Sequence, residues 1–227
     1  WETRLEGARM ELEFDDMHMN HVQLISFEPD ATEIAIHCEG EVELEETHGI
    51  IGKHQGYVPM WLFLRTTPLT KPGAGVRQLV QELGEGGTSL DSLHALSTHV
   101  LDRVTYQTGQ THAASTAEEV IETGKGVCQD HAHVFIAAAR LMGVPARYVS
   151  GYLMMDDRVD QDAAHAWVEA HVEGLGWVGF DVSNGISPDM RYVRVATGLD
   201  YSEAAPVSGM RFGSGEERMQ VALQVQQ

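Results

Sequence analysis

The chain has 227 residues, enough for one large domain or two small ones, and its hydrophobic fraction of 43% permits a sizeable core. Its 34 acidic residues outnumber its 15 basic residues, and the formal net charge of −19 argues against nucleic acids and anionic membrane surfaces as partners. The sequence contains no apolar run that could span a bilayer and no visible signal peptide, although it opens at Trp1 rather than at a methionine.

The two cysteines, Cys38 and Cys128, bear on the redox compartment. Cys38 falls in an alternating β pattern, so we expect it to lie in the core as a small apolar residue. Two unpaired cysteines fit a reducing compartment, and we expect a cytoplasmic protein. A natural segment missing before Trp1 could have carried a targeting signal or a further strand.

Residues 1–58 are predicted to form a small antiparallel β domain. Apolar and acidic residues alternate over residues 10–15, and the same period of two recurs over 22–24, 34–38 and 42–44. This period indicates half-buried strands with one polar face in water. The histidines of this region lack metal-ligand spacing, so we interpret them as surface or turn residues.

Residues 59–75 contain three prolines around an apolar segment, and we interpret them as a linker that packs against its neighbours. Apolar residues then recur at helical spacing over 76–83 and 93–104, which predicts two helices. The tetrapeptide TAEE at 116–119 has the pattern of a capping box and predicts a third, short helix that ends at Gly124.

A glycine-rich turn, a cysteine and an amphipathic helix follow one another over residues 124–143. Gly143 and Pro145 provide the stop, so Cys128 is predicted in the first turn of this helix. First-turn N–H groups lack intrahelical partners and favour negative charge, so they can stabilise a thiolate and an oxyanion. The alternative is that Cys128 is a small buried apolar residue. The residues downstream are needed to distinguish a nucleophile from a structural cysteine.

After Pro145 the chain is predicted to be β-rich again. Residues 148–154 have the pattern of a strand, and the acidic loop at 156–162 is a candidate rim for a substrate site. Two further alternating runs lie at 191–196 and 219–225. Helices followed by antiparallel strands indicate an α+β fold.

Residues 163–185 consist of two alternating runs around a glycine-containing turn, which predicts a hairpin with its tip near 173–176. His165 lies on the first strand and Asp181 closes the second, so folding at this tip brings the two side chains together within one register step. With Cys128 they supply a nucleophile, its base and the group that orients the base.

Three motifs carry these residues in the order Cys, His, Asp. They are GVCQDHAH (126–133), GVPARYVSGY (143–152), and HAWVE (165–169) followed by GWVGFD (176–181). With these motifs the chain resembles bacterial members of the transglutaminase-like superfamily, which is distantly papain-like. The clear match spans about residues 106–185, and the upstream part looks like the family's β-rich N-terminal domain. Relatives often have Asp-Pro-Thr-Asn where this chain has DVSN (181–184), a departure that spares Asp181.

The resemblance implies a papain-like or transglutaminase-like α+β core, in which the nucleophile helix packs on an antiparallel sheet, preceded by a small antiparallel β domain. It implies a β-rich N-terminal domain at residues 1–58, a linker at 59–75 and a catalytic core at 76–227.

The resemblance also implies a cysteine-dependent acyl-transfer enzyme that acts on peptide or protein amide bonds without a cofactor. Cys128 would form a thioester, His165 would move the proton and Asp181 would orient the imidazole. We favour hydrolysis over amine transfer because no separate amine site can be identified in the sequence. A cross-linking transglutaminase and a non-catalytic binding module are the alternatives, and the sequence gives no oligomeric state.

Four residues near the motifs are candidates for substrate contact. Trp167 could form a wall of the cleft, and Tyr152 and Gln129 belong to the matching motifs. Asn184 is expected either to contact the substrate or to fix Asp181 or cap a turn. The first-turn residue Asp130 is interpreted as a charge that complements the helix dipole.

A zinc site built on Cys128 is the remaining alternative. Cys128 and His131 are three residues apart and could share an ion, but His131 and His133 point about 200° apart on a helix of 3.6 residues per turn. The spacing therefore argues against zinc, and we expect no metal.

Overall fold

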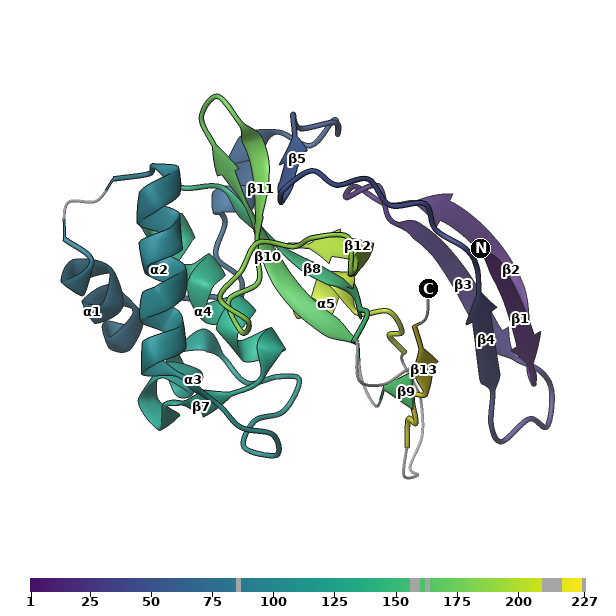
Figure 1. Cartoon of the computed structure of the whole chain (residues 1–227). Coiled ribbons are helices and arrows are strands. Elements are labelled where there is room, and N and C mark those ends of the chain that lie inside the picture. Colours follow the sequence, from purple (N-terminus) through teal and green to yellow (C-terminus); the bar gives the residue numbers. More distant parts are fainter. Residues whose placement is uncertain (85–86, 156–159, 162–163, 210–217, 226–227) are drawn as a thin grey trace. The chain divides into compact units, whose positions relative to one another are not determined.

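The computed structural model describes residues 1–84, 87–155, 160–161, 164–209 and 218–225 (Figure 1). The chain divides into two compact units. The first consists of Trp1–Glu45 with Gly56–Val58, and the second of Glu46–Gln55 with Pro59–Gln227. The functional division at residues 58 and 75 stays a prediction.

The N-terminal unit contains two antiparallel strand pairs. Strand β1 (Glu2–Glu6) pairs with β4 (Ala35–Glu39), and β2 (Ala8–Asp15) pairs with β3 (His21–Phe27). The alternation over 10–15, 22–24 and 34–38 thus marks strands, as predicted, whereas the run at 42–44 forms no strand.

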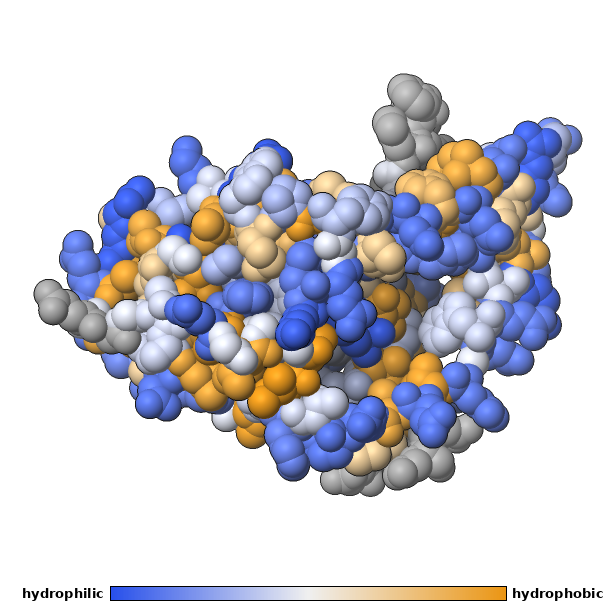
Figure 2. Space-filling model, turned by 90° about the horizontal axis from the view of Figure 1, so that it is seen from above, coloured by the Kyte–Doolittle hydropathy of each residue, from blue (hydrophilic) through white to orange (hydrophobic). Residues whose placement is uncertain are grey.

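The expected burial of this unit is wrong in part. Leu12 and Phe14 share a face of the β2–β3 pair but are each 47% exposed, and Met10, on the other side of a bulge in β2, is 43% exposed. Cys38, expected in the core, is an exposed free thiol on the two-stranded β1–β4 pair opposite Thr3. A two-stranded sheet has no second layer to cover its apolar face, so a period of two predicts a strand without ensuring its burial. Figure 2 shows hydrophobic residues in orange exposed among hydrophilic ones.

The second unit is built on a five-stranded antiparallel sheet with the strand order β12-β8-β10-β11-β5. Its strands are β5 (Ile50–Gly52), β8 (Ala146–Leu153), β10 (His165–Val172), β11 (Gly176–Phe180) and β12 (Tyr192–Gly198). The predicted hairpin is the β10–β11 pair. The run expected at 219–225 forms a strand only at β13 (Leu223–Gln224), which pairs with β9 (Asp160–Gln161). The rest of the acidic loop at 156–162 lies outside the described residues.

The described helices include all those predicted from the periodicity. They are η1 (Met60–Leu64), α1 (Ala74–Glu82), α2 (Leu90–Arg103), α3 (Ala117–Thr123), α4 (Cys128–Leu141) and α5 (Tyr201–Ala204). The capping box at α3 is present, because Thr116 and Glu119 each accept the other's backbone N–H. The short strands β6 (Thr105–Tyr106) and β7 (Lys125–Gly126) pair in parallel just before α4. The α+β prediction is confirmed.

Helix α4 lies between the other helices and the sheet (Figure 1). Its residues from Val134 to Ala139 are fully buried, so this part of the helix, predicted as amphipathic, is enclosed on every side. Ala166, Val168 and Ala170 on β10 belong to the same apolar core. The alternate residues of β10 therefore lie on the opposite face of the sheet.

Arg140, near the end of α4, connects four other parts of the second unit. Its guanidinium, in a residue that is 5% exposed, donates to the backbone oxygens of Phe63, Ala146 and Leu199 and to Thr70 Oγ1. Burial lowers the pKa of Arg140 to about 10, so the group stays charged at neutral pH. A buried cation of this kind is tolerated because each of its three nitrogen atoms donates to an oxygen atom.

We expect Arg140→Met to lower the free energy of unfolding by about 3 kcal/mol, because it leaves several buried acceptors without a donor. Denaturant unfolding followed by tryptophan fluorescence measures the change. Arg77→Met, at an exposed position of α1, is the matched control. A loss no larger than that of the control would show that the Arg140 contacts contribute little.

Candidate active site

Cys128 is the first residue of α4 and is half-buried. The turn before it is fixed by Asp130, whose Oδ2 accepts the backbone N–H of Val127 at 2.7 Å and the hydroxyl of Thr111 at 2.6 Å. A Cβ at Gly126 would lie 2.6 Å from the Asp130 Cβ, so glycine leaves the room that this contact needs. Asp130 therefore closes the turn that presents Cys128, a role beyond the expected effect on the helix dipole.

His165 opens β10 and lies between the other two predicted triad residues. Its Nε2 is 2.6 Å from Asp181 Oδ2, and interaction with Cys128 is among the causes that raise the pKa of His165. Because Nε2 is engaged by Asp181, Nδ1 is the ring nitrogen left for the thiol. The structure thus brings Cys128, His165 and Asp181 together, with His165 in the middle, as the motifs predict.

Burial alone would lower the pKa of His165, but the hydrogen bonds to Asp181 and Cys128 and their charges outweigh burial and raise the pKa to about 10. The imidazole is therefore protonated at neutral pH. The side chain is 14% exposed, enough for one edge of the ring to be reached from outside.

Asp181 has no exposed side-chain surface and is held by four hydrogen bonds. Its Oδ2 accepts from His165, from Asn184 Nδ2 at 2.7 Å and from the Tyr192 hydroxyl at 2.6 Å, and its Oδ1 accepts the Asn184 backbone N–H at 3.2 Å. Burial raises the pKa of the Asp181 carboxyl, but these hydrogen bonds outweigh it and lower the pKa. Asp181 is thus a fixed, charged partner of the imidazole.

The hairpin register explains how His165 reaches Asp181. Val168 pairs with Phe180, so continuing the ladder would set Asp181 opposite Trp167. His165 lies one pair further on the same face and contacts Asp181 diagonally, a separation that long side chains span. The two side chains therefore meet across an offset of two residues, one more than the single register step expected from the sequence.

Trp167 packs beside the imidazole and is 3% exposed. Its ring is stacked on His165, with centroids 6.3 Å apart, and meets Tyr192 edge-on at 5.4 Å. A Cβ at Gly151 would lie 2.4 Å from the Trp167 ring, so glycine makes space for the indole. A substrate contact of Trp167 stays a prediction, while its described contacts support the base.

The other three expected substrate residues lie in different surroundings. Tyr152 is a half-buried residue of β8 paired with Val193. Gln129 donates from Nε2 to the backbone oxygen of Ala113 at 3.1 Å and so holds the loop before α3. Asn184 fixes Asp181, which is one of its two expected structural roles. Substrate contact by these three residues stays a prediction.

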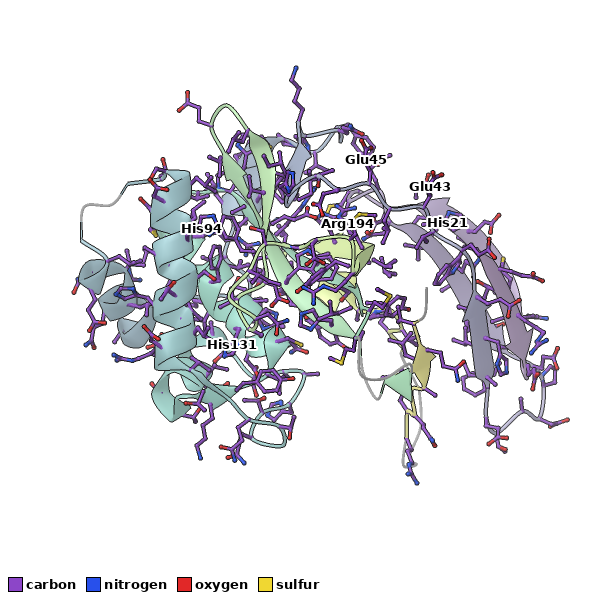
Figure 3. All side chains as sticks on the ribbon, in the orientation of Figure 1. His21, Glu43, Glu45, His94, His131 and Arg194 are labelled. Atoms are coloured by element: carbon purple, nitrogen blue, oxygen red, sulfur yellow. The ribbon has the colours of Figure 1, made fainter. Side chains whose placement is uncertain are left out.

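His131, which the sequence analysis weighs as a metal ligand, has a supporting place (Figure 3). It is fully buried, with Nδ1 2.8 Å from Ser183 Oγ and Nε2 2.9 Å from the backbone oxygen of Val104. Burial lowers the pKa of His131, so the ring is neutral and can donate to Val104 while accepting from Ser183. It ties α4 to the loop after Asp181. His131 follows Cys128 by three residues and so lies on the same side of the helix. This spacing is the sequence signal that could have placed His131 near the site.

Two tyrosines of the site were not identified from the sequence. Tyr192 belongs to a run predicted only as a strand, and Tyr106 pairs with Gly126 in the β6–β7 pair. Burial raises the pKa of Tyr106, and the charges of Cys128, Asp181 and Asp130 raise it further. The phenol of Tyr106 therefore lies near the triad. Tyr106 is 53% exposed and is a candidate for the rim of the site.

In the described part of the chain, no group of three or more His, Cys, Asp or Glu side chains is arranged to hold a metal ion. The two cysteines are both free. None of the helices that the structure describes is long and apolar enough to cross a membrane.

Comparison with known proteins gives one matching family and several relatives. Residues 77–182 match the model of the Transglutaminase-like superfamily. The chain is 28% identical over 167 residues to an uncharacterized protein of Mycobacterium leprae, covering 71% of this chain and 59% of that protein. It is 29% identical over 117 residues to a protein-glutamine gamma-glutamyltransferase of Pseudomonas aeruginosa, covering 45% of this chain and 17% of the relative. The chain thus spans little more than half of the mycobacterial protein.

A solved structure extends the similarity over the whole chain. It is the crystal structure of a candidate cysteine protease from Cytophaga hutchinsonii, with a TM-score of 0.66 and 21% identity. The match covers 100% of this chain and 80% of that one. At this level of identity the similarity concerns the fold.

The raised pKa of His165 predicts a pH-dependent contribution to stability. Because the pKa is about 10 in the folded protein against an ordinary 6.5, this contribution is complete below about pH 6.5 and is lost as the pH rises through about 10. We expect the difference in free energy of unfolding between wild type and His165→Gln to be largest near pH 6 and to shrink toward pH 10. Denaturant unfolding at several pH values measures it.

The exposed His112→Gln variant controls for the loss of a histidine. A difference between wild type and His165→Gln that stays constant or grows toward pH 10 would contradict the raised pKa.

Proposed function

We propose, from the premise that this chain belongs to the transglutaminase-like superfamily through residues 77–182, that it is a cysteine-dependent acyl-transfer enzyme acting on peptide or amide bonds. The observation that carries the proposal is the contact of His165 Nε2 with Asp181 Oδ2 at 2.6 Å, together with the influence of Cys128 on the pKa of His165. A nucleophile, a base and a group that orients the base are the parts that such chemistry requires.

In the first half of the reaction, the sulfur of Cys128 attacks the amide carbonyl carbon, and the carbonyl electron pair moves onto oxygen. The backbone N–H of Cys128 belongs to the first turn of α4, where N–H groups have no intrahelical acceptor, and it is positioned to stabilise this oxyanion. When the carbon–nitrogen bond breaks, the protonated His165 gives its proton to the leaving amine. An acyl thioester on Cys128 remains.

In the second half, neutral His165 accepts a proton from the incoming nucleophile, which attacks the thioester and releases the thiolate. Water as the nucleophile gives hydrolysis, and an amine gives transamidation. We favour hydrolysis because the sequence offers no separate amine site. The Pseudomonas relative named a gamma-glutamyltransferase supports amine transfer as the second candidate. A non-catalytic binding module is less favoured, because all three triad side chains are present and in contact.

The first test is the reactivity of Cys128 toward iodoacetamide at about pH 6, measured by peptide mass. A Cys128 sulfur activated by His165 should be alkylated at about pH 6, where an ordinary thiol reacts slowly. The exposed Cys38 serves as an internal control in the same molecule. We expect Cys128 to react faster than Cys38, and His165→Ala to abolish the difference. Equal, slow labelling of both cysteines in wild type would refute the proposed chemistry.

The second test separates the role of Asp181 from its place in the fold. We expect Asp181→Asn to lower turnover of a peptide amide by about 10²–10⁴-fold, because the imidazole loses the anion that orients it. Asp102→Asn, at an exposed position of α2 away from the site, is the control. Turnover is measured alongside the melting temperature. Full activity of Asp181→Asn would remove Asp181 from the triad.

A further inference from the structure

Asp181 has a third side-chain donor that the triad itself does not require. Tyr192, the first residue of β12, donates its hydroxyl to Asp181 Oδ2 at 2.6 Å and is 6% exposed. We propose that Tyr192 is a positioning residue of the active site, which holds the Asp181 carboxylate and the His165 ring in their working orientation. The inference rests on the proposed acyl-transfer function and adds a residue to it.

The position of Tyr192 is set by structure on both sides of it. Its backbone pairs with Leu153 of β8, and the turn before it is held by the ion pair of Arg191 and Asp189 at 2.6 Å. Tyr192 follows Asp181 by 11 residues, so the intervening segment leaves β11 and returns the hydroxyl to the carboxylate. A side chain fixed by a strand and a closed turn can hold a partner in place.

The aromatic ring of Tyr192 provides a second contact to the triad. It lies 5.9 Å from the His165 ring at an angle of 57°, and 5.4 Å from the Trp167 ring at 85°. The hydroxyl thus contacts the orienting carboxylate while the ring packs against the base. One side chain therefore fixes the relative position of His165 and Asp181 from a third strand.

The hydroxyl is a permanent donor under ordinary conditions. Burial raises the pKa of Tyr192 well above its usual value, and the neighbouring Asp181 charge raises it further. Among the described residues, four other titratable groups lie around Asp181. They are His165, Cys128 on the far side of His165, and the neutral side chains of His131 and Tyr106. Since Tyr192 does not titrate near neutral pH, its contribution to Asp181 is positional.

Loss of the hydroxyl has a specific consequence for the carboxylate. Oδ2 would keep His165 and Asn184 as donors, but one side of a fully buried oxygen would be left without a partner. The carboxylate could then rotate away from Nε2 to improve its remaining contacts. The hydroxyl of Tyr192 contacts Asp181 and its ring packs on His165 and Trp167, so we expect an effect on the chemical step and on thiol reactivity rather than on substrate binding.

The test is Tyr192→Phe, which removes one oxygen atom and keeps the ring. We expect about a 10-fold lower kcat and a similarly slower alkylation of Cys128 at about pH 6, with KM within about two-fold of wild type. Tyr192→Leu, which also loses the ring contact, should be slower still. Tyr201→Phe, on α5 of the same unit, is the matched control and should behave as wild type.

The alkylation assay needs no substrate, so it separates failure of this inference from failure of the proposed function. If Cys128 of the wild type reacts no faster than Cys38, the function fails. If Cys128 is fast in both wild type and Tyr192→Phe, the role of Tyr192 is overturned and the function stands. A variant with a lowered melting temperature but wild-type alkylation of the folded protein would likewise make Tyr192 structural and overturn the inference.

Discussion

The arrangement of the site depends on a buried ion pair between His165 and Asp181. A carboxylate without exposed surface is costly unless its charge is paired and its lone pairs are used. Asp181 meets this requirement with hydrogen bonds from β10, from β12 and from the residues directly after β11. The ends of three strands are thereby fixed to one another at the point where the base is needed.

The same fixing extends to the helix that carries the cysteine. At its start, Asp130 holds the preceding turn and His131 reaches Ser183 beside Asp181, while near its end Arg140 holds backbone oxygens of three other segments. A helix held at both ends and buried along its length has little freedom to move relative to the sheet. The distance from sulfur to imidazole is thus set by the core rather than by a flexible loop.

Much of this could be predicted because the informative signals are local. The cysteine motif, the capping box and the hairpin each depend on residues close in sequence, and they led to the helices, the strands and the meeting of His165 with Asp181. Tyr192 was missed because its partner lies across a connection whose path has no local signature. The exposure of Cys38 and of the β2–β3 apolar face was also missed, since alternation gives a strand's period but not what covers it.

Alternate residues of β10 point to opposite faces of the sheet, so one face contributes to the core and the other to the site. Ala166, Val168 and Ala170 join the apolar core with α4, while His165, Trp167 and Glu169 lie on the other face. On that face, buried Glu169 pairs with Arg147 and with Arg194 of β12, so two cations meet one anion there. The strand therefore keeps a locally cationic face next to the His165–Asp181 pair, within a chain of formal net charge −19. Because charges in contact outweigh distant, screened ones, the protonation of His165 depends on Asp181 and Cys128 rather than on the overall charge.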